Sequence, residues 1–503
     1  MALILLVICQ PIFARAYGGP DEDWANSVIQ TPDGGFLVGG STWGFGSAWI
    51  DMLLVKISPS GIIEWAKTLG GGGPDRLGEL VLAPDGGFFV AGYTGSFGAD
   101  EWDVLAAKLS ASGELEWAKR LGLATSEVVS TAVACSDAGL ILAGGEYMGE
   151  QGFDLTLLKL SAAGSRQWGM KLAGTGPDFA EGIAETDEGE LVVVGWTMSW
   201  GEGYSDVLVA SFSEGGALNW ARTYGSPEHD AGFGIARAQD GGFVVIGETW
   251  GLGALRSDIL VLKIDSAGGL TWARRYEGVG SERGLSITKS PDGGYLISGE
   301  TSTLDVLMMR VSESGDLIWA KSFGGPEPDT LGMGILTAEG DLLVAGSTAS
   351  VGAGLSDMFA LRLPLDGNYP GCLSEYPLIQ VDTTPAVNTV PDAVSAYFPW
   401  QWDAEPRINP QSPEWEDICP PEVEEASDND NAMVIPVVIR GGVMFMSRVS
   451  TDIRIYSSDG RLVYLGKLEK GENNLSLRRG VYLWVAGRGS SASNPYKGRV
   501  VVR

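Results

Sequence analysis

The sequence predicts an all-β protein in which a seven-bladed β-propeller is followed by a small C-terminal Ig-like β-sandwich. Three observations predict this fold class. Glycine makes up 73 of the 503 residues, long amphipathic helical patterns are absent, and one pattern of about 52 residues recurs seven times. Many short strands joined by tight glycine turns have this composition.

The repeat is marked by an aspartate that opens an apolar run. Its seven copies are Asp51, Asp103, Asp154, Asp206, Asp258, Asp305 and Asp357. Each unit predicts four strands, which in the second unit cover residues 78–83, 88–94, 103–110 and 115–121. Four-stranded antiparallel units of this kind bury their faces only against their neighbours, which favours radial closure into a propeller.

The N-terminal segment is expected to close this ring. Seven third strands are predicted but only six fourth strands, because the chain after Leu363 continues into a different composition. Residues 13–19 match the fourth strand at residues 220–226. We therefore expect a propeller of residues 13–363 whose first strand completes blade seven and removes two exposed sheet edges. Residues 1–12 resemble a signal peptide with a truncated start, cleaved before Phe13.

A tryptophan follows the turn between the third and fourth strands, usually four residues after a glycine. The six copies are Trp65, Trp117, Trp168, Trp220, Trp272 and Trp319. The pattern resembles the docking motif of quinoprotein-like and WD40-like propellers, which implies that each indole packs between adjacent blades. Neither an adjacent cysteine pair nor an eighth blade is found, so we expect no quinone or other cofactor.

The seven opening aspartates are interpreted first as structural turn residues. As in WD40 repeats, short acceptors at this corner bind backbone N–H groups. Calcium is the alternative ligand, although no Asp-x-Asp-x-Asp-Gly loop is present. We expect no metal site, because the chain has one histidine, His229, and no CxxC motif.

Residues 364–431 are expected to form a Pro-rich acidic extension and linker. This part contains 11 of the 24 prolines and acidic clusters at residues 422–425 and 427–431. The interpretation is an irregular extended segment on the propeller, followed by a solvated linker. Cys372 and Cys419 flank the irregular stretch and are candidates for a disulfide, whereas Cys135 is expected to be a buried thiol.

Residues 432–503 predict the β-sandwich. The segments I-x-I-Y-x-x-x-G-R-L-V from residue 453, G-V-Y-L-x-V from residue 480 and K-G-R-V-V-V-R from residue 497 predict strands. Their order at the C-terminus resembles the type A sorting domain of the type IX secretion system. The resemblance implies outer-membrane translocation and a secreted or cell-surface protein, with the secretion machinery as partner; the alternative is an ordinary accessory sandwich.

Function is expected on the face that carries the loops between second and third strands and between successive blades. The formal net charge of −30 excludes a nucleic-acid partner. Exposed aromatic rings beside carboxylates are typical of a glycan-binding face. The candidate ligand-binding residues are Trp43, Trp49, Trp102, Trp200, Tyr204, Trp250, Asp21, Asp23, Asp75, Asp230 and Asp329.

Three functional classes stay open from the sequence. A monomeric, non-catalytic scaffold for glycans or envelope proteins is favoured. The first alternative is a secreted carbohydrate-active enzyme that uses carboxylates of the same face. The second is a purely structural adhesion protein whose ring is a docking platform.

Overall fold

The computed structural model describes residues 12–46, 49–97, 101–122, 125–352, 354–368 and 373–390 and, beyond these, only the strands β32 to β42. Contacts divide the chain into two compact units, residues 1–418 and 419–503. The described residues contain one helical turn, the 3-10 helix η1 (Gly149–Gln151). No described helix has the length and apolar character needed to cross a membrane.

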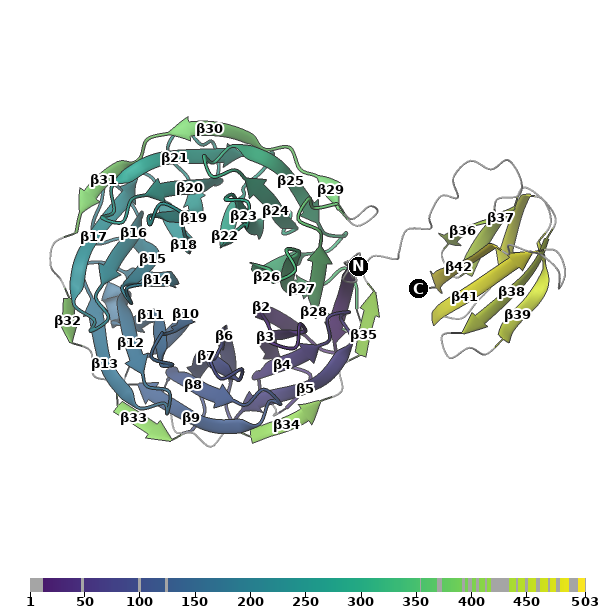
Figure 1. Ribbon diagram of the computed structural model, residues 1–503, viewed down its shortest axis with the longest axis horizontal. Helices are drawn as coiled ribbons and strands as arrows, with labels where there is room; N and C mark the ends of the chain where they lie inside the picture. Colours follow the sequence, from purple (N-terminus) through teal and green to yellow (C-terminus); the bar gives the residue numbers. More distant parts are fainter. Residues whose placement is uncertain are drawn as a thin grey trace, which may run out of the picture. The chain divides into compact units, whose positions relative to one another are not determined.

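The first unit is a ring of seven antiparallel sheets around a central opening (Figure 1). The innermost strand of each blade, strand a, is β2 (Asp23–Gln30), β6 (Asp75–Leu82), β10 (Glu127–Ala134), β14 (Asp178–Glu185), β18 (Asp230–Arg237), β22 (Arg283–Lys289) or β26 (Asp329–Leu336). Strand b is β3 (Phe36–Thr42), β7 (Phe88–Thr94), β11 (Leu140–Tyr147), β15 (Leu191–Thr197), β19 (Phe243–Thr249), β23 (Tyr295–Glu300) or β27 (Leu342–Thr348).

The two further strands of each blade complete the predicted repeat. Strand c is β4 (Asp51–Ile57), β8 (Asp103–Leu109), β12 (Phe153–Leu160), β16 (Asp206–Phe212), β20 (Asp258–Ile264), β24 (Val306–Val311) or β28 (Asp357–Leu363). Strand d is β5 (Ile63–Gly70), β9 (Leu115–Gly122), β13 (Arg166–Leu172), β17 (Leu218–Gly225), β21 (Leu270–Glu277), β25 (Leu317–Phe323) or β1 (Phe13–Gly18). The predicted seven-bladed, all-β ring is confirmed.

Strand a begins earlier than the sequence pattern indicates. In blade two β6 starts at Asp75 rather than at residue 78, and its register against β7 shifts between Leu77 and Glu79. The same irregularity occurs in strand a of the other six blades. A bulge breaks the two-residue alternation of apolar side chains, so the first half of each strand lacks the pattern that identifies a strand.

The N-terminal strand closes blade seven as predicted. β1 pairs antiparallel with β28, from Phe13 opposite Arg362 to Tyr17 opposite Met358. Tyr17 is fully buried, and its hydroxyl donates to the Gly61 carbonyl of blade one at 2.8 Å. The backbone ladder therefore completes blade seven, and the side-chain hydrogen bond joins this blade to blade one.

The hydrophobic core lies between blades rather than within them. One cluster combines Tyr17, Leu343 and Met358 of blade seven with Phe36 and Leu53 of blade one. Other clusters combine neighbouring blades in the same way around the ring. No blade can bury both faces without two neighbours.

The six tryptophans of the repeat lie at these boundaries. Ring atoms of Trp65 lie 2.9 Å from where a Cβ on Gly113, in the next blade, would stand, and Trp117 has the same relation to Gly164. Phe13 takes the equivalent place against Gly61, so blade seven uses a phenylalanine. A side chain on these glycines would collide with the ring, and their φ angles of 75° to 76° also suit glycine.

The extension after the propeller is more regular than expected. It runs back around the ring and adds a fifth strand, antiparallel to strand d, to every blade (Figure 1). We call these seven strands the belt: β29 (Ser374–Glu375), β30 (Ile379–Thr383), β31 (Ala386–Thr389), β32 (Val394–Ala396), β33 (Trp400–Asp403), β34 (Arg407–Gln411) and β35 (Glu414–Asp417). The belt begins on blade six, and its last strand, β35, pairs with β1. Cys372 and Cys419 lie outside the described residues, as do residues 1–11.

The described part of the second unit contains seven strands in two antiparallel sheets. One sheet has the order β36 (Val434–Ile439), β37 (Gly442–Ser447), β40 (Gly471–Leu475), and the other β39 (Leu462–Leu468), β38 (Thr451–Ser457), β41 (Gly480–Gly487), β42 (Tyr496–Val502). The first motif segment falls on β38 and the start of β39, and the other two fall on β41 and β42 of the same sheet. The Ig-like arrangement of the two sheets stays a prediction.

Truncating Tyr17 should destabilise the ring at its closure. Tyr17→Ala is expected to lower the free energy of unfolding by about 3–5 kcal/mol, because it leaves a cavity at the boundary of blades seven and one. Tyr17→Phe should cost about 1 kcal/mol for the lost hydrogen bond. The measurement is urea denaturation followed by tryptophan fluorescence.

The matched control for this experiment is Tyr204→Ala, at an exposed position of a loop, which should change stability by less than about 0.5 kcal/mol. Wild-type stability in Tyr17→Ala would show that β1 does not hold the ring closed.

Candidate functional site

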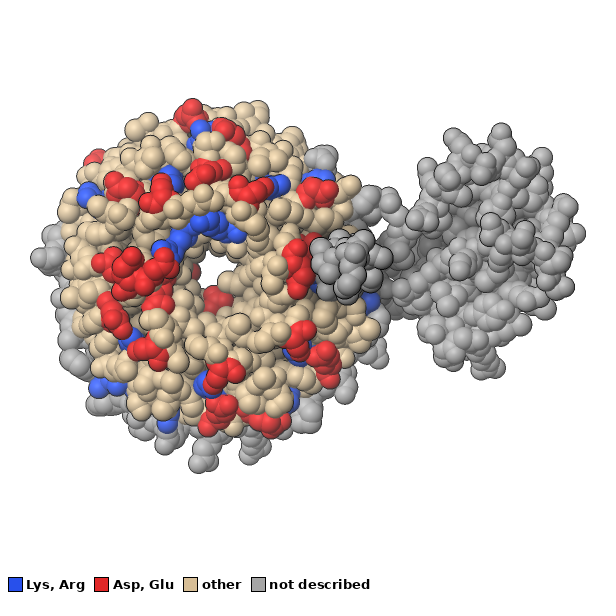
Figure 2. Space-filling view, viewed as in Figure 1, with Lys and Arg blue, Asp and Glu red and all other residues tan. Residues whose placement is uncertain are grey.

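The variable loops of the propeller lie on one face. The turns between strands a and b contain five residues in every blade, whereas those between strands b and c contain eight residues in five blades and five in blades three and six. We call the side with the b–c and d–a connections the loop face and the other side the turn face. Figure 2 shows one face of the ring, with acidic side chains spread over it and one group of basic side chains beside the central opening.

Buried acids begin strand a in six blades and precede it by one residue in blade six. They are Asp23, Asp75, Glu127, Asp178, Asp230, Glu282 and Asp329, all at most 1% exposed. The Asp75 carboxylate accepts from the Gly71 amide at 2.7 Å and from the Ser96 hydroxyl at 2.9 Å. The Asp329 carboxylate accepts from the Gly325 amide at 2.7 Å. These bonds hold the d–a loops in place.

This burial corrects part of the sequence interpretation. Asp23, Asp75, Asp230 and Asp329 were expected to meet a ligand at the surface, but they are fully buried. From the sequence, an acid that stands between a loop motif and an apolar run is expected to belong to the loop. The bulged start of strand a moves it inside, where backbone amides of the d–a loop donate to its carboxylate.

Five of the seven opening aspartates are held in one of two ways. In blades four and seven, b–c loop amides donate to the carboxylate: Glu202 N to Asp206 at 3.0 Å and Gly354 N to Asp357 at 3.1 Å. In blades two, three and five a cation of strand d pairs with it. The pairs are Arg120 with Asp103, Lys171 with Asp154, and Arg275 with Asp258. Their contacts therefore fit turn-fixing residues.

The two sets of acids form pairs at the boundaries between blades. At six boundaries the opening aspartate lies 24 residues before the buried acid of the next strand a, as Asp51 does before Asp75. At the seventh boundary Asp357 is paired with Asp23. In four blades, strand d has an uncharged residue at the position that Arg120 occupies in blade two. These residues are Thr68, Thr223, Ser322 and Ala16. Burial raises the pKa of Asp75, of Asp178 and of Asp206 to about 6, and a neighbouring carboxylate adds to each shift.

Two groups of side chains on the loop face are exposed. The blade 4/5 patch comprises Met198, Tyr204, His229, Trp250 and Leu255. Tyr204 is 67% exposed and stacks on His229 with ring centroids 5.0 Å apart, and Trp250 is 49% exposed. The Trp250 amide donates to the His229 carbonyl at 2.8 Å, which fixes the two loops side by side. The carboxylate of Glu228 is also exposed beside His229.

The blade 7/1 patch comprises Trp43, Trp49 and Leu355. Trp43 and Leu355 line a hollow of about 290 Å³ together with Asp21 and Glu22. Trp102 and Trp200, also expected at the surface, are partly buried: Trp102 packs edge-to-face on Tyr93 at 5.0 Å, and Trp200 packs on the core between blades three and four. The expected aromatic face therefore consists of two separate patches.

The mouth of the central opening contributes residues that the sequence interpretation missed. A hollow of about 340 Å³ is lined by Trp24, Arg76, Tyr93 and Glu300, among others. Trp24 and Arg76 each follow a buried acid of strand a, and Tyr93 and Glu300 lie at the end of strand b. Their regular place after the acids is the signal that would have indicated them.

Other chemistry in the described chain is limited. No group of three or more His, Cys, Asp or Glu side chains is placed to hold a metal ion in the part of the chain that the structure covers. Cys135 is a buried free thiol, and burial raises its pKa to about 12. The thiolate needed for reactivity is therefore disfavoured at neutral pH.

Some solved structures are distantly similar to this chain. No protein family matches the chain, and no curated protein matches it. Among solved structures, YCF48 bound to D1 peptide is 11% identical, covers 69% of this chain and 97% of its own, and has a TM-score of 0.40. Sqt1 from Chaetomium thermophilum is 14% identical with coverages of 91% and 98% and a TM-score of 0.43. A glucose dehydrogenase is 12% identical with coverages of 69% and 98% and a TM-score of 0.37.

The raised pKa values predict that stability falls as the pH rises. A carboxyl whose folded pKa exceeds its unfolded value stabilises the fold while protonated, and this contribution is lost as the pH rises through the folded pKa. The free energy of unfolding should therefore fall by at least about 2 kcal/mol between about pH 5 and about pH 7. Urea denaturation at these pH values measures it.

Two variants separate this effect from surface charge. Asp206→Asn should lessen the pH dependence, because one buried group no longer titrates. Asp187→Asn, at an exposed carboxylate whose pKa Arg237 lowers, should leave it unchanged in this range. A free energy of unfolding that rises towards neutral pH would contradict the assignment.

Proposed function

We propose that this protein is a non-catalytic binding scaffold of the cell surface whose loop face binds glycans. The observation that carries the proposal is the blade 4/5 patch, where Tyr204 and Trp250 are 67% and 49% exposed and Glu228 is exposed as well. Sugar C–H faces stack on aromatic rings, and carboxylates accept from sugar hydroxyls. Exposed aromatic rings held by backbone hydrogen bonds are typical of a binding surface.

The blade 7/1 patch supports a second point of attachment. It repeats the combination of exposed rings and acids, with Trp43 at 43% exposure next to Asp21 and Glu22. Two patches on one rigid ring would engage a polymeric ligand at two places, which raises its effective concentration at the second patch. The rigid ring then sets which spacings of the ligand can be bound.

Four candidate acids of the loop face do not support the alternative of a carbohydrate-active enzyme. Asp23, Asp75, Asp230 and Asp329 are buried and hold loops, so they are not available to flank a glycosidic bond. Asp21 lies beside Trp43 and fits a role in binding.

Replacing the exposed rings should weaken glycan binding without affecting the fold. Trp250→Ala and Tyr204→Ala should each reduce affinity about tenfold, the effect of about 1.4 kcal/mol of lost stacking. The ligand is first found on a glycan array with the full chain and then measured by isothermal titration of the oligosaccharide.

The matched control is Ile62→Ala, because Ile62 is 49% exposed in a turn between strands c and d. It should bind like the wild type. Unaltered affinity in a Trp43, Tyr204 and Trp250 triple alanine variant would remove glycan binding from both patches.

The proposal includes export through the C-terminal unit. Its support is the resemblance of residues 453–463, 480–485 and 497–503 to the type A sorting domain, together with the place of these segments on adjacent strands of one sheet. The sheet order β38, β41, β42 brings the three motifs side by side.

Removing residues 432–503 should therefore prevent release or surface attachment. In a bacterium that has the type IX secretion system, cell fractionation should find the truncated chain in the periplasm and the full chain outside. Thermal melting of the truncated chain checks that the propeller still folds. Surface localisation of a folded truncated chain would refute this part of the proposal.

A further inference from the structure

A cation of strand c, buried in five blades and partly buried in blade six, holds the a–b turn in six of the seven blades. In blade one Lys56 lies 3.0 Å from Asp33, and in blade five Lys263 lies 2.7 Å from Asp240. The other pairs are Lys108 with Asp85, Lys159 with Asp137, Arg310 with Asp292, and Arg362 with Glu339 and Asp341. The repeat thus supplies each turn acid with a positive charge from its own blade.

Blade seven shows how a turn with two acids is neutralised. The Arg362 side chain is fully buried, and its guanidinium lies 3.3 Å from the Glu339 carboxylate and 2.9 Å from that of Asp341. A planar guanidinium can serve two carboxylates at once, which an ammonium does less well.

Blade four has acids at the same two positions of the turn but no arginine in strand c. Its turn, Thr-Asp-Glu-Gly-Glu, places Glu188 and Glu190 where blade seven has Glu339 and Asp341. Ser211 stands in the place of Arg362: it pairs with Val192, two residues after Glu190, as Arg362 pairs with Leu343, two residues after Asp341. The position of the cation is therefore taken by an uncharged side chain.

The two acids of blade four are exposed to solvent and have few partners within the protein. Glu190 accepts from the Asn219 amide at 3.3 Å. The Glu188 carboxylate has no hydrogen bond or ion pair among the described residues, and its charge acts on Arg237 from a longer distance. Arg237 itself is held by Asp187, with two N–H to oxygen contacts of 2.6 and 2.9 Å.

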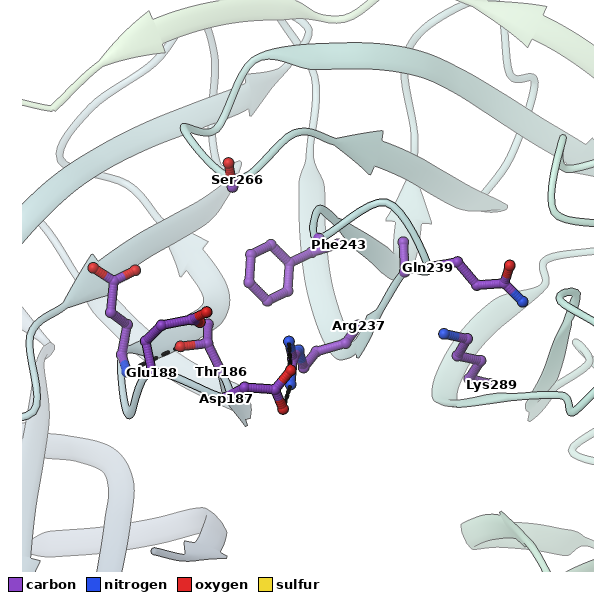
Figure 3. Close-up of a pocket in the computed structure, with 11 residues that line it drawn as sticks. Thr186, Asp187, Glu188, Arg237, Gln239, Phe243, Ser266 and Lys289 are labelled. Atoms are coloured by element: carbon purple, nitrogen blue, oxygen red, sulfur yellow. Dashed lines mark hydrogen bonds and ion pairs between the residues drawn. The ribbon is translucent and has the colours of Figure 1, made fainter. Parts of the chain in front are cut away.

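A hollow of about 900 Å³ opens beside this turn, on the turn face between blades four and five. Figure 3 shows Thr186, Asp187 and Glu188 on one side, Gln239 and Lys289 on the other, and the Phe243 ring above Arg237. The hollow thus offers acceptors for a cation at one end and a basic and an amide side chain at the other. It has room for more than a single side chain.

We propose that this hollow binds the arginine side chain of an extended peptide, with the guanidinium between Glu188 and Glu190. The ligand supplies in trans the group that Arg362 supplies in blade seven. A carboxylate next to the arginine in the ligand faces Lys289. The site lies on the face opposite the proposed glycan surface and does not depend on it.

The test uses the full chain and a fluorescently labelled acetyl-Gly-Arg-Glu-Gly-amide peptide, with binding measured by anisotropy. A peptide with citrulline in place of arginine should bind at least tenfold more weakly, because citrulline keeps the shape and loses the charge. Glu188→Gln should weaken the arginine peptide to a similar extent. Lys289→Met should weaken it too, but should not affect a peptide with glutamine in place of glutamate.

The decisive variant is Ser211→Arg, which restores the arrangement of blade seven. It should abolish peptide binding while the melting temperature stays equal or rises, since the chain then fills its own site. Equal binding of the arginine and citrulline peptides, or undiminished binding to a folded Ser211→Arg protein, would overturn the proposal. Tyr204→Ala should bind the peptide normally, so failure here is distinct from failure of glycan binding.

Discussion

The structure depends on the burial of apolar faces between blades. Residues of one blade complete the core of the next, as Tyr17 and Met358 do with Phe36 and Leu53. Because each blade needs two neighbours, the stabilisation of all seven depends on closure of the ring. Closure is achieved by the pairing of β1 with β28, which places the beginning of the chain beside the end of the last repeat.

The belt extends the same principle to the outside of the ring. A blade without it would present strand d as an unpaired edge, which is a template for association with other chains. Each blade receives a fifth strand instead, and β1 lies between β28 and β35. The closing strand is thus bonded on both edges, by segments that lie more than 300 residues away in sequence.

The repeated residues lie in the interior of the ring, whereas the proposed binding sites lie on its two faces. The buried acids and docking rings repeat in nearly every blade because each boundary has the same task. Two departures from the repeat are the exposed rings of the blade 4/5 patch on the loop face and the buried Ser211, at the strand-c position that carries a cation in the other six blades. Where a blade lacks the contact that the repeat makes elsewhere, the groups left without it can bind a ligand.

Much of this protein could be derived from the sequence alone. The number of blades, their four strands, the closing role of residues 13–18 and the boundary tryptophans follow from a repeat long enough to be recognised against itself. Such patterns are local, and a repeat makes each one visible seven times. The tertiary structure decided where single side chains lie. The bulge in strand a buries Asp75 and Asp230, Trp200 packs inwards whereas Tyr204 does not, and the belt forms because seven strand edges are available, a condition that exists only after the ring has closed.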